Sequence, residues 1–186
     1  MLLEYHDHVE VGDYSIPINN SHKAYIVALK ILRSKDIFEE DKEEALIPLL
    51  FREPVPQGLE NEAIIAYFEL FAEKKKTGKH EQSFDIVQDA DYIFAGFMQV
   101  YGIDLDECDM KVEKFIALLK GLPSETKLSE IIRIRTMEVP KATKYNAKQI
   151  SDILIAKRDF ALDNSGEING MKSFGTFVKE WARHGR

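Results

Sequence analysis

The chain has little of several residue types that would point to a particular class of protein. Cys108 is the single cysteine among 186 residues, so an internal disulfide and any metal site built from several cysteines are excluded. No apolar run approaches the ~20 residues of a membrane-spanning helix. Residues 1–10 carry Glu4, Asp7 and Glu10, whereas a secretory signal is basic and then apolar. We therefore expect a cytoplasmic protein with no membrane segment.

Positive charge is outnumbered by negative charge. The chain has 25 Lys and Arg against 32 Asp and Glu, a formal charge of -7, which opposes the attraction to phosphates that supplies most non-specific nucleic-acid binding. Nucleic acid is therefore not an expected partner. Residues 1–140 carry 16 Lys and Arg against 27 Asp and Glu, while residues 141–186 carry 9 against 5. An acidic body with a basic end permits head-to-tail self-association, although solvated helix faces explain the same pattern more simply.

Apolar residues make up 45% of the chain and aromatic residues 10%, enough to offset the entropy lost on folding. Near the start, alternating apolar residues such as Val9 and Ile16 flank the pair Gly12-Asp13. This pattern predicts a β-hairpin with a two-residue turn. Pro17 lacks an amide hydrogen for a sheet, so the second strand should lie at an edge.

Most of the remaining chain has apolar residues spaced three and four apart, which predicts helices. Pro48 predicts a kink or break in one of them. The predicted fold class is mainly α: a multi-helix, bundle-like fold with a short N-terminal β-hairpin. The expected helices run from a cap at Asn20 or Ser21 to near Ser34, then over 39–50, 59–76, 87–101 and 110–120, from a cap at Ser124 to before Pro140, over 145–162, and from Ser173 to the end.

Three regions are expected from this pattern. Residues 1–76 form the hairpin and a helical lobe, residues 84–162 form a helical core, and residues 163–186 form a basic, aromatic extension. The polar stretch 74–83 has no apolar period and is interpreted as a linker or exposed loop. The two lobes alternatively pack as one domain.

Motifs for chemistry are missing. The histidines of His6-Asp7-His8 lie on alternate positions, and on an extended segment such side chains point to opposite faces, so they do not meet at one metal ion. The sequence has no glycine-rich phosphate loop and no nucleophile elbow. We expect a binding protein rather than an enzyme, with no cofactor, no metal and no catalytic residue.

Two segments are candidate partner-binding surfaces, because an exposed apolar stripe accepts an amphipathic helix. The helix at 87–101 is apolar over a broad arc, and the end of the chain is rich in aromatic residues. Apolar stripes at helical spacing more often belong to the core of a protein than to a binding surface. The solvent exposure of their side chains distinguishes the two possibilities. The candidate residues are Ile93, Phe94, Phe97, Met98 and Tyr101 in the first segment, and Phe174, Phe177 and Trp181 in the second.

A family resemblance covers roughly residues 9–162. It is carried by the order and spacing of Gly12-x-Tyr14-x-Ile16-Pro17-Ile18-Asn19, Tyr92-Ile93-Phe94-Ala95, Tyr101-Gly102-Ile103-Asp104-Leu105, Lys114-Phe115-Ile116-Ala117-Leu118-Leu119-Lys120-Gly121-Leu122-Pro123, Leu128-Ser129-Glu130-Ile131-Ile132 and Ile134-Arg135-Thr136. In these segments the chain resembles a small family of bacteriophage proteins named after gene product fifteen. The family often has paired tryptophans where this chain has Val112 and Glu113, and residues 163–186 extend beyond its pattern.

The resemblance implies a tail assembly chaperone of a tailed phage or prophage. Such a protein binds the tape-measure protein and leaves before the virion is complete. A wider version of the same hypothesis includes binding of tail-tube subunits. A second hypothesis is a minor component retained in the finished tail. A third, a host-directed enzyme or regulator, requires a polar pocket assembled from distant residues such as Asp89, Asp91 or Arg135.

Overall fold

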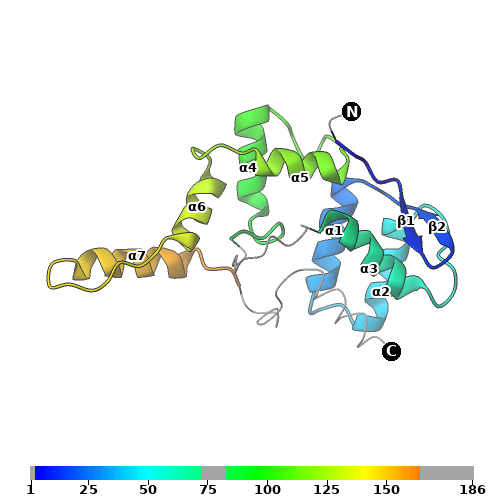
Figure 1. Ribbon diagram of the computed structural model, residues 1–186, viewed down its shortest axis with the longest axis horizontal. Helices are drawn as coiled ribbons and strands as arrows, with labels where there is room; N and C mark the ends of the chain where they lie inside the picture. The colour runs from blue at the N-terminus through cyan, green and yellow to red at the C-terminus, as the bar shows by residue number, and fades with distance from the viewer. Residues whose placement is uncertain (1–2, 73–82, 164–186) are drawn as a thin grey trace. The chain divides into compact units, whose positions relative to one another are not determined.

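The computed structural model describes residues 3–72 and 83–163 (Figure 1). These divide into two compact units. The first contains 3–72 together with 109–117, and the second contains 83–108 and 118–163. Across the described residues there are seven helices and one two-stranded antiparallel sheet, which confirms the mainly α fold class. Residues 109–117, which the sequence pattern groups with the second half, pack with the first unit.

The predicted hairpin is present at the start of the first unit. Strand β1 (His8–Val11) pairs with β2 (Tyr14–Pro17) in an antiparallel register that places Val9 opposite Ile16. Gly12 opens the two-residue turn with a φ of 56°, a conformation that favours glycine. The buried side chains of Val9 and Ile16 fix one face of the hairpin toward the core.

Three helices complete most of the first unit: α1 (His22–Arg33), α2 (Glu39–Leu50) and α3 (Glu60–Phe71). The hydroxyl of Ser21 caps α1 by accepting a hydrogen bond from the Lys23 amide at 3.2 Å, so of the two predicted caps, Asn20 and Ser21, the structure selects Ser21. The apolar faces of the helices meet in one core. Its largest buried members include Leu29, Leu32, Leu46, Leu50, Ile64, Tyr67 and Phe68.

The sequence predicts a kink or a break at Pro48, and the structure of α2 excludes the break. The helix continues through Pro48 to Leu50 and is not broken, and Pro48 lies exposed in its last turn. On the buried side, the ammonium group of Lys42 donates a hydrogen bond of 3.1 Å to the carbonyl of Leu32, near the end of α1. This cation at the C-terminal end of α1 favours the packing of α2 on α1.

Aromatic rings occupy the centre of the first unit. The ring of Tyr67 lies 5.3 Å from that of Phe68 and 5.2 Å from that of Phe71, between centroids, and Tyr25 lies 5.6 Å from Phe71. The near-perpendicular arrangements suit the ring quadrupoles. Burial raises the pKa of the Tyr25 hydroxyl from its ordinary value of 10 to about 12, because the ionised form would lose its hydration in the core.

The second unit contains α4 (Ala90–Tyr101), the end of α5 (Val112–Lys120), α6 (Lys127–Thr136) and α7 (Ala147–Asp159). Gly102 ends α4 with a φ of 62°, as its position predicts. The buried core of this unit consists of Ile93, Phe97, Leu105, Leu119, Leu128 and Ile131.

The cap of α6 lies two residues later than predicted. Thr126, and not Ser124, accepts a hydrogen bond from the Ser129 amide at 3.3 Å and is buried. The predicted linker at 74–83 and the predicted helix from Ser173 fall almost entirely outside the described residues. Within 3–72 and 83–163, none of the helices combines the length and apolar character needed to cross a membrane.

Candidate binding surface on helix α7

Helix α7 presents apolar residues on two sides. Ile153 and Ala156 face α6 and line a small groove with Ile134 and Met137. The other apolar residues lie on the opposite side, because residues three, four and seven apart share one face of a helix. The second side is not covered by any described element: no residue of α7 is buried.

One side of α7 is attached firmly to α6. The ammonium group of Lys157 donates hydrogen bonds to the carbonyls of Arg135 at 2.5 Å and Met137 at 2.8 Å, at the end of α6. The guanidinium Nε of Arg135 in turn donates to the Phe160 carbonyl at 2.5 Å. These bonds satisfy carbonyls that a helix end leaves without partners. They hold α7 in place while its far side remains accessible.

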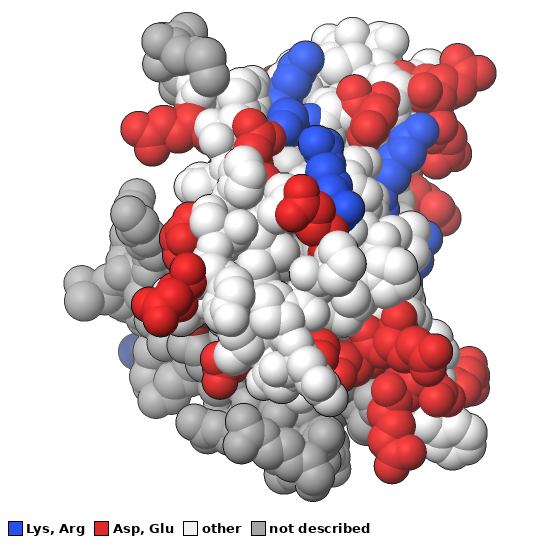
Figure 2. Space-filling view, turned by 90° about the vertical axis from the view of Figure 1, so that its right-hand side faces the viewer, with Lys and Arg blue, Asp and Glu red and all other residues white. Residues whose placement is uncertain are grey.

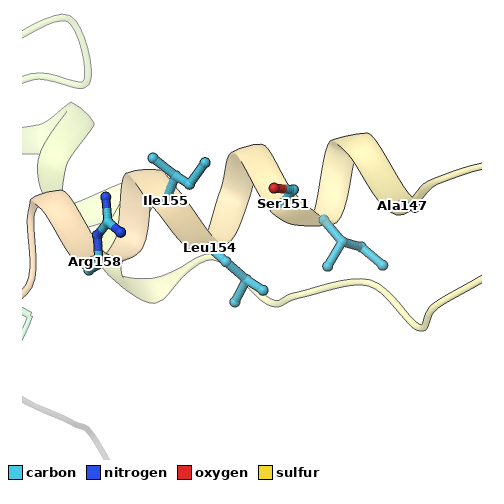
Figure 3. A pocket seen from close by; sticks show the side chains of 6 residues that line it. Ala147, Ser151, Leu154, Ile155 and Arg158 are labelled. Atoms are coloured by element: carbon cyan, nitrogen blue, oxygen red, sulfur yellow. The ribbon is translucent and has the colours of Figure 1, made fainter.

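The accessible side forms a shallow groove of about 370 Å³ that is lined by α7 alone (Figure 3). Leu154 is 51% exposed and Ile155 is 46% exposed. Isolated exposed apolar residues are common on protein surfaces, but adjacent ones on one helix face form a stripe. The lining residues are Ala147, Ile150, Ser151, Leu154, Ile155 and Arg158.

The sequence-predicted binding residues of α4 lie mostly inside the second unit. Ile93 is 2% exposed and Phe97 is 0% exposed, so neither offers surface to a partner. The hydroxyl of Tyr101 donates to the Leu118 carbonyl at 2.9 Å, which fixes its half-buried ring against Phe97. The broad apolar arc of α4 is therefore largely core.

The remaining predicted binding residues have different positions. Phe94 is half-buried, and Met98 is 44% exposed, so Met98 is the member of the α4 set with the most accessible surface. The residues Phe174, Phe177 and Trp181 lie outside the described residues. The more extensive exposed apolar stripe is on α7, which the sequence pattern indicates only as an ordinary amphipathic helix.

Two of the residues suggested for a polar pocket do meet, as a closed ion pair. Arg135 donates to both carboxylate oxygens of Asp89, at 2.6 and 2.8 Å, and Asp89 also accepts from the Asp85 amide at 2.9 Å. Asp89 is 1% exposed, while Asp91, two residues on, is exposed. The pair joins α4 to α6 and has no free carboxylate oxygen aimed at a cleft.

His6, the first histidine of His6-Asp7-His8, has structural contacts. His6 donates its amide to the Glu113 carboxylate at 2.7 Å, and its ring nitrogen Nδ1 lies 3.0 Å from the same oxygen. Asp7 instead pairs with Lys111. Among residues 3–72 and 83–163, no group of three His, Cys, Asp or Glu side chains is placed to hold a metal ion.

Glu113 lies at one of the two positions where the resemblance described above implies tryptophan. Burial raises the pKa of its carboxyl, but hydrogen bonds from the His6 amide and from the Asn20 side chain outweigh burial, so the pKa lies below its ordinary value. Asn20 also accepts a hydrogen bond from the Val112 amide at 2.9 Å. Val112 is fully buried. Glu113 therefore takes part in a hydrogen-bond network inside the first unit and Val112 in its apolar core. Neither position contributes to an aromatic surface.

Comparison with known families adds one finding to this geometry. The model of the protein family described as Bacteriophage Gp15 protein matches residues 6–162 of the chain. The chain belongs to this phage protein family. The match includes α7 and ends just after it. No curated protein and no solved structure matches the chain.

Proposed function

We propose that this Gp15 family member is a non-catalytic tail assembly chaperone that binds helical segments of the phage tape-measure protein and shields them until the tail tube encloses them. The observation that carries the proposal is the uncovered apolar face of α7, with Leu154 and Ile155 about half exposed. Membership in a phage protein family supports the biological setting.

The physical basis is the docking of one helix on another. Helix α7 has 13 residues and is about 20 Å long at 1.5 Å per residue, enough for three to four turns of a partner helix. Covering one half-exposed leucine or isoleucine contributes about 1 kcal/mol, which is small against the entropy cost of association. A single contact is therefore weak. Many copies along one long tape-measure polypeptide would shield it reversibly.

Charge suits the same role. Glu40, Asp41 and Glu44 are exposed on α2, and Figure 2 shows groups of acidic side chains on the side of the first unit that carries the hairpin, α2 and α3. A net charge far from zero keeps a protein in solution. Copies bound along an apolar polypeptide would repel one another and so hold it soluble.

The proposal is tested by co-expression with the tape-measure protein of the same phage. We expect the chain to keep the tape-measure protein in the soluble fraction and to co-purify with it. The double substitution Leu154→Glu and Ile155→Glu should abolish both effects. Val27→Glu on α1, where Val27 is 43% exposed, is the matched control and should leave both unchanged. Equal capture by the double variant and the wild type would contradict the role of α7.

Purified particles distinguish a chaperone from a minor structural component. We expect mass spectrometry of complete virions to lack this chain while tail precursors contain it. A fixed stoichiometric amount in complete virions would instead place the protein in the finished tail.

A further inference from the structure

We infer that, before it meets a partner, the protein pairs with a second copy of itself through α7, with the two α7 helices antiparallel. The inference rests on the proposed function in taking the uncovered face of α7 as its binding face. It adds a resting state in which each copy covers the apolar stripe of the other.

The spacing of the groove residues fits such a pair. The sequence intervals between successive lining residues are three, one, three, one and three positions. This order is the same when it is read from either end of α7. An antiparallel copy therefore places Ile150 opposite Ile155, and the small Ser151 opposite the large Leu154. Ala147 lies opposite Arg158, where it leaves room for the aliphatic stem of the arginine. One patch of this kind matches itself about a twofold axis, as a closed dimer requires.

Charged residues beside the groove select the antiparallel direction. Lys148 and Asp159 lie 11 positions apart in α7, close to three full turns, so they share one flank of the helix at opposite ends. In the antiparallel pair, Lys148 of each copy and Asp159 of the other lie on the same flank, and their levels along the helix axis differ by about half a helical turn. A parallel pair would place the two flanks on opposite sides of the interface, so Lys148 of one copy and Asp159 of the other would not meet.

The helix dipoles favour the same direction. Asp159 of one copy lies beside the positive N-terminal end of the other α7, and Lys148 lies beside the negative C-terminal end. Within its own chain, Asp159 contacts Arg158 at 3.0 Å in an exposed pair. The exposed position of both side chains leaves the carboxylate accessible to the lysine of the second copy.

The length of α7 limits the strength of the pair. A helix of about 20 Å covers less than the ~800 Å² per partner of a standard stable interface. The dimer should therefore form weakly and exchange rapidly. A tape-measure polypeptide that binds many copies would displace the second copy from each α7, because both occupy the same face of the helix.

The test uses the full chain alone in sedimentation velocity across a concentration series. We expect a monomer–dimer equilibrium that Leu154→Glu abolishes. Lys148→Glu and Asp159→Lys should each weaken it about tenfold, because each replaces two attractive contacts with two repulsive ones.

A charge exchange between the two positions makes the test specific. An equimolar mixture of the Lys148→Glu and Asp159→Lys variants should recover the wild-type constant. The mixed dimer keeps one native pair, Lys148 with Asp159. At its other end, the new glutamate of one copy faces the new lysine of the other, so both contacts are again attractive.

Folding defects are separated from loss of pairing by circular dichroism. Lys148→Glu adds an acid to the first turn of α7 and Asp159→Lys adds a base to its last turn, and both changes favour the helix. Helicity should therefore be kept or increased while pairing is lost.

A wild-type chain that stays monomeric throughout, or a mixture of the two variants no stronger than either alone, would overturn the dimer. Neither result depends on tape-measure capture, since no tape-measure protein is present. Capture without dimerisation would refute this inference and leave the proposed function standing, whereas dimerisation without capture would do the reverse.

Discussion

The buried Asp89–Arg135 pair offers a quantitative test of how the second unit supports α7. The substitution Arg135→Met removes two bonds to a carboxylate that is 1% exposed, and it removes the donor to the Phe160 carbonyl that fixes the end of α7. Breaking a buried pair costs about 3 to 5 kcal/mol. Asp89 keeps its hydrogen bond from the Asp85 amide, so we expect a loss of about 3 kcal/mol, at the low end of that range.

Urea unfolding followed by circular dichroism measures this loss. With a slope of about 1 to 3 kcal/mol per molar urea, the midpoint of the second unit should fall by about 1 to 3 M. Hydrogen exchange at the amides of α4 and α6 should localise the effect to that unit. Arg158→Ala, at an exposed ion pair, is the control and should change stability by no more than about 0.5 kcal/mol.

The double variant Asp89→Leu with Arg135→Met tests the cause. Removing both charges leaves no buried carboxylate without a partner, although the Asp85 amide loses its acceptor, at a cost of about 1 to 3 kcal/mol. The double variant should therefore be less destabilised than the sum of the two single variants, by about 2 kcal/mol. Additive losses, or a loss below about 1 kcal/mol for Arg135→Met alone, would contradict a stabilising role for the buried pair.

Three further predictions concern other contacts. The pKa of Glu113 is lowered, so its ionised form stabilises the first unit at pH values above the ordinary pKa of 4.5, and this stabilisation is lost as the pH falls through the folded-state pKa. Glu113→Gln should therefore flatten the acid side of a curve of stability against pH. An unchanged curve would contradict this role of Glu113. Tyr67→Phe removes the hydroxyl that donates to the Asn19 carbonyl at 3.1 Å and should cost about 1 kcal/mol in urea unfolding. Gly102→Ala meets no steric contact but forces alanine to a φ of 62°, so the melting temperature should fall by an amount equivalent to about 1 kcal/mol.

Local structure can largely be predicted from the sequence. Helical periodicity, the Ser21 cap and the Gly102 stop locate α1 and α4 closely, because each of these signals acts over a few neighbouring residues. The α6 cap is harder to place, because Ser124 and Thr126 precede the same apolar stripe and only the fold decides which of them reaches the Ser129 amide. Pro48 does not end α2, although it has no amide hydrogen to donate to the carbonyl four residues earlier, and the helix ends two residues after it at Leu50.

The binding surface cannot be predicted in the same way. An apolar stripe shows that a helix face avoids water, but not which element covers it. The arc of α4 around Ile93 and Phe97 is apolar on several sides because it forms the core of its unit. The second apolar side of α7, with Leu154 and Ile155, has the same kind of signal and is exposed. The two cases differ only in long-range packing, which periodicity does not contain.

Hydrogen exchange of the full chain, at a concentration low enough to keep it monomeric, with and without a soluble tape-measure fragment from the same phage is the most direct test of partner binding by α7. Binding that covers one face of α7 should suppress its local opening. We predict slower exchange for amides across Ala147–Asp159 and no change in α1, which carries the exposed Val27 control position. Protection confined to α1 or α4, with exchange in α7 unchanged, would contradict the claim that α7 holds the partner.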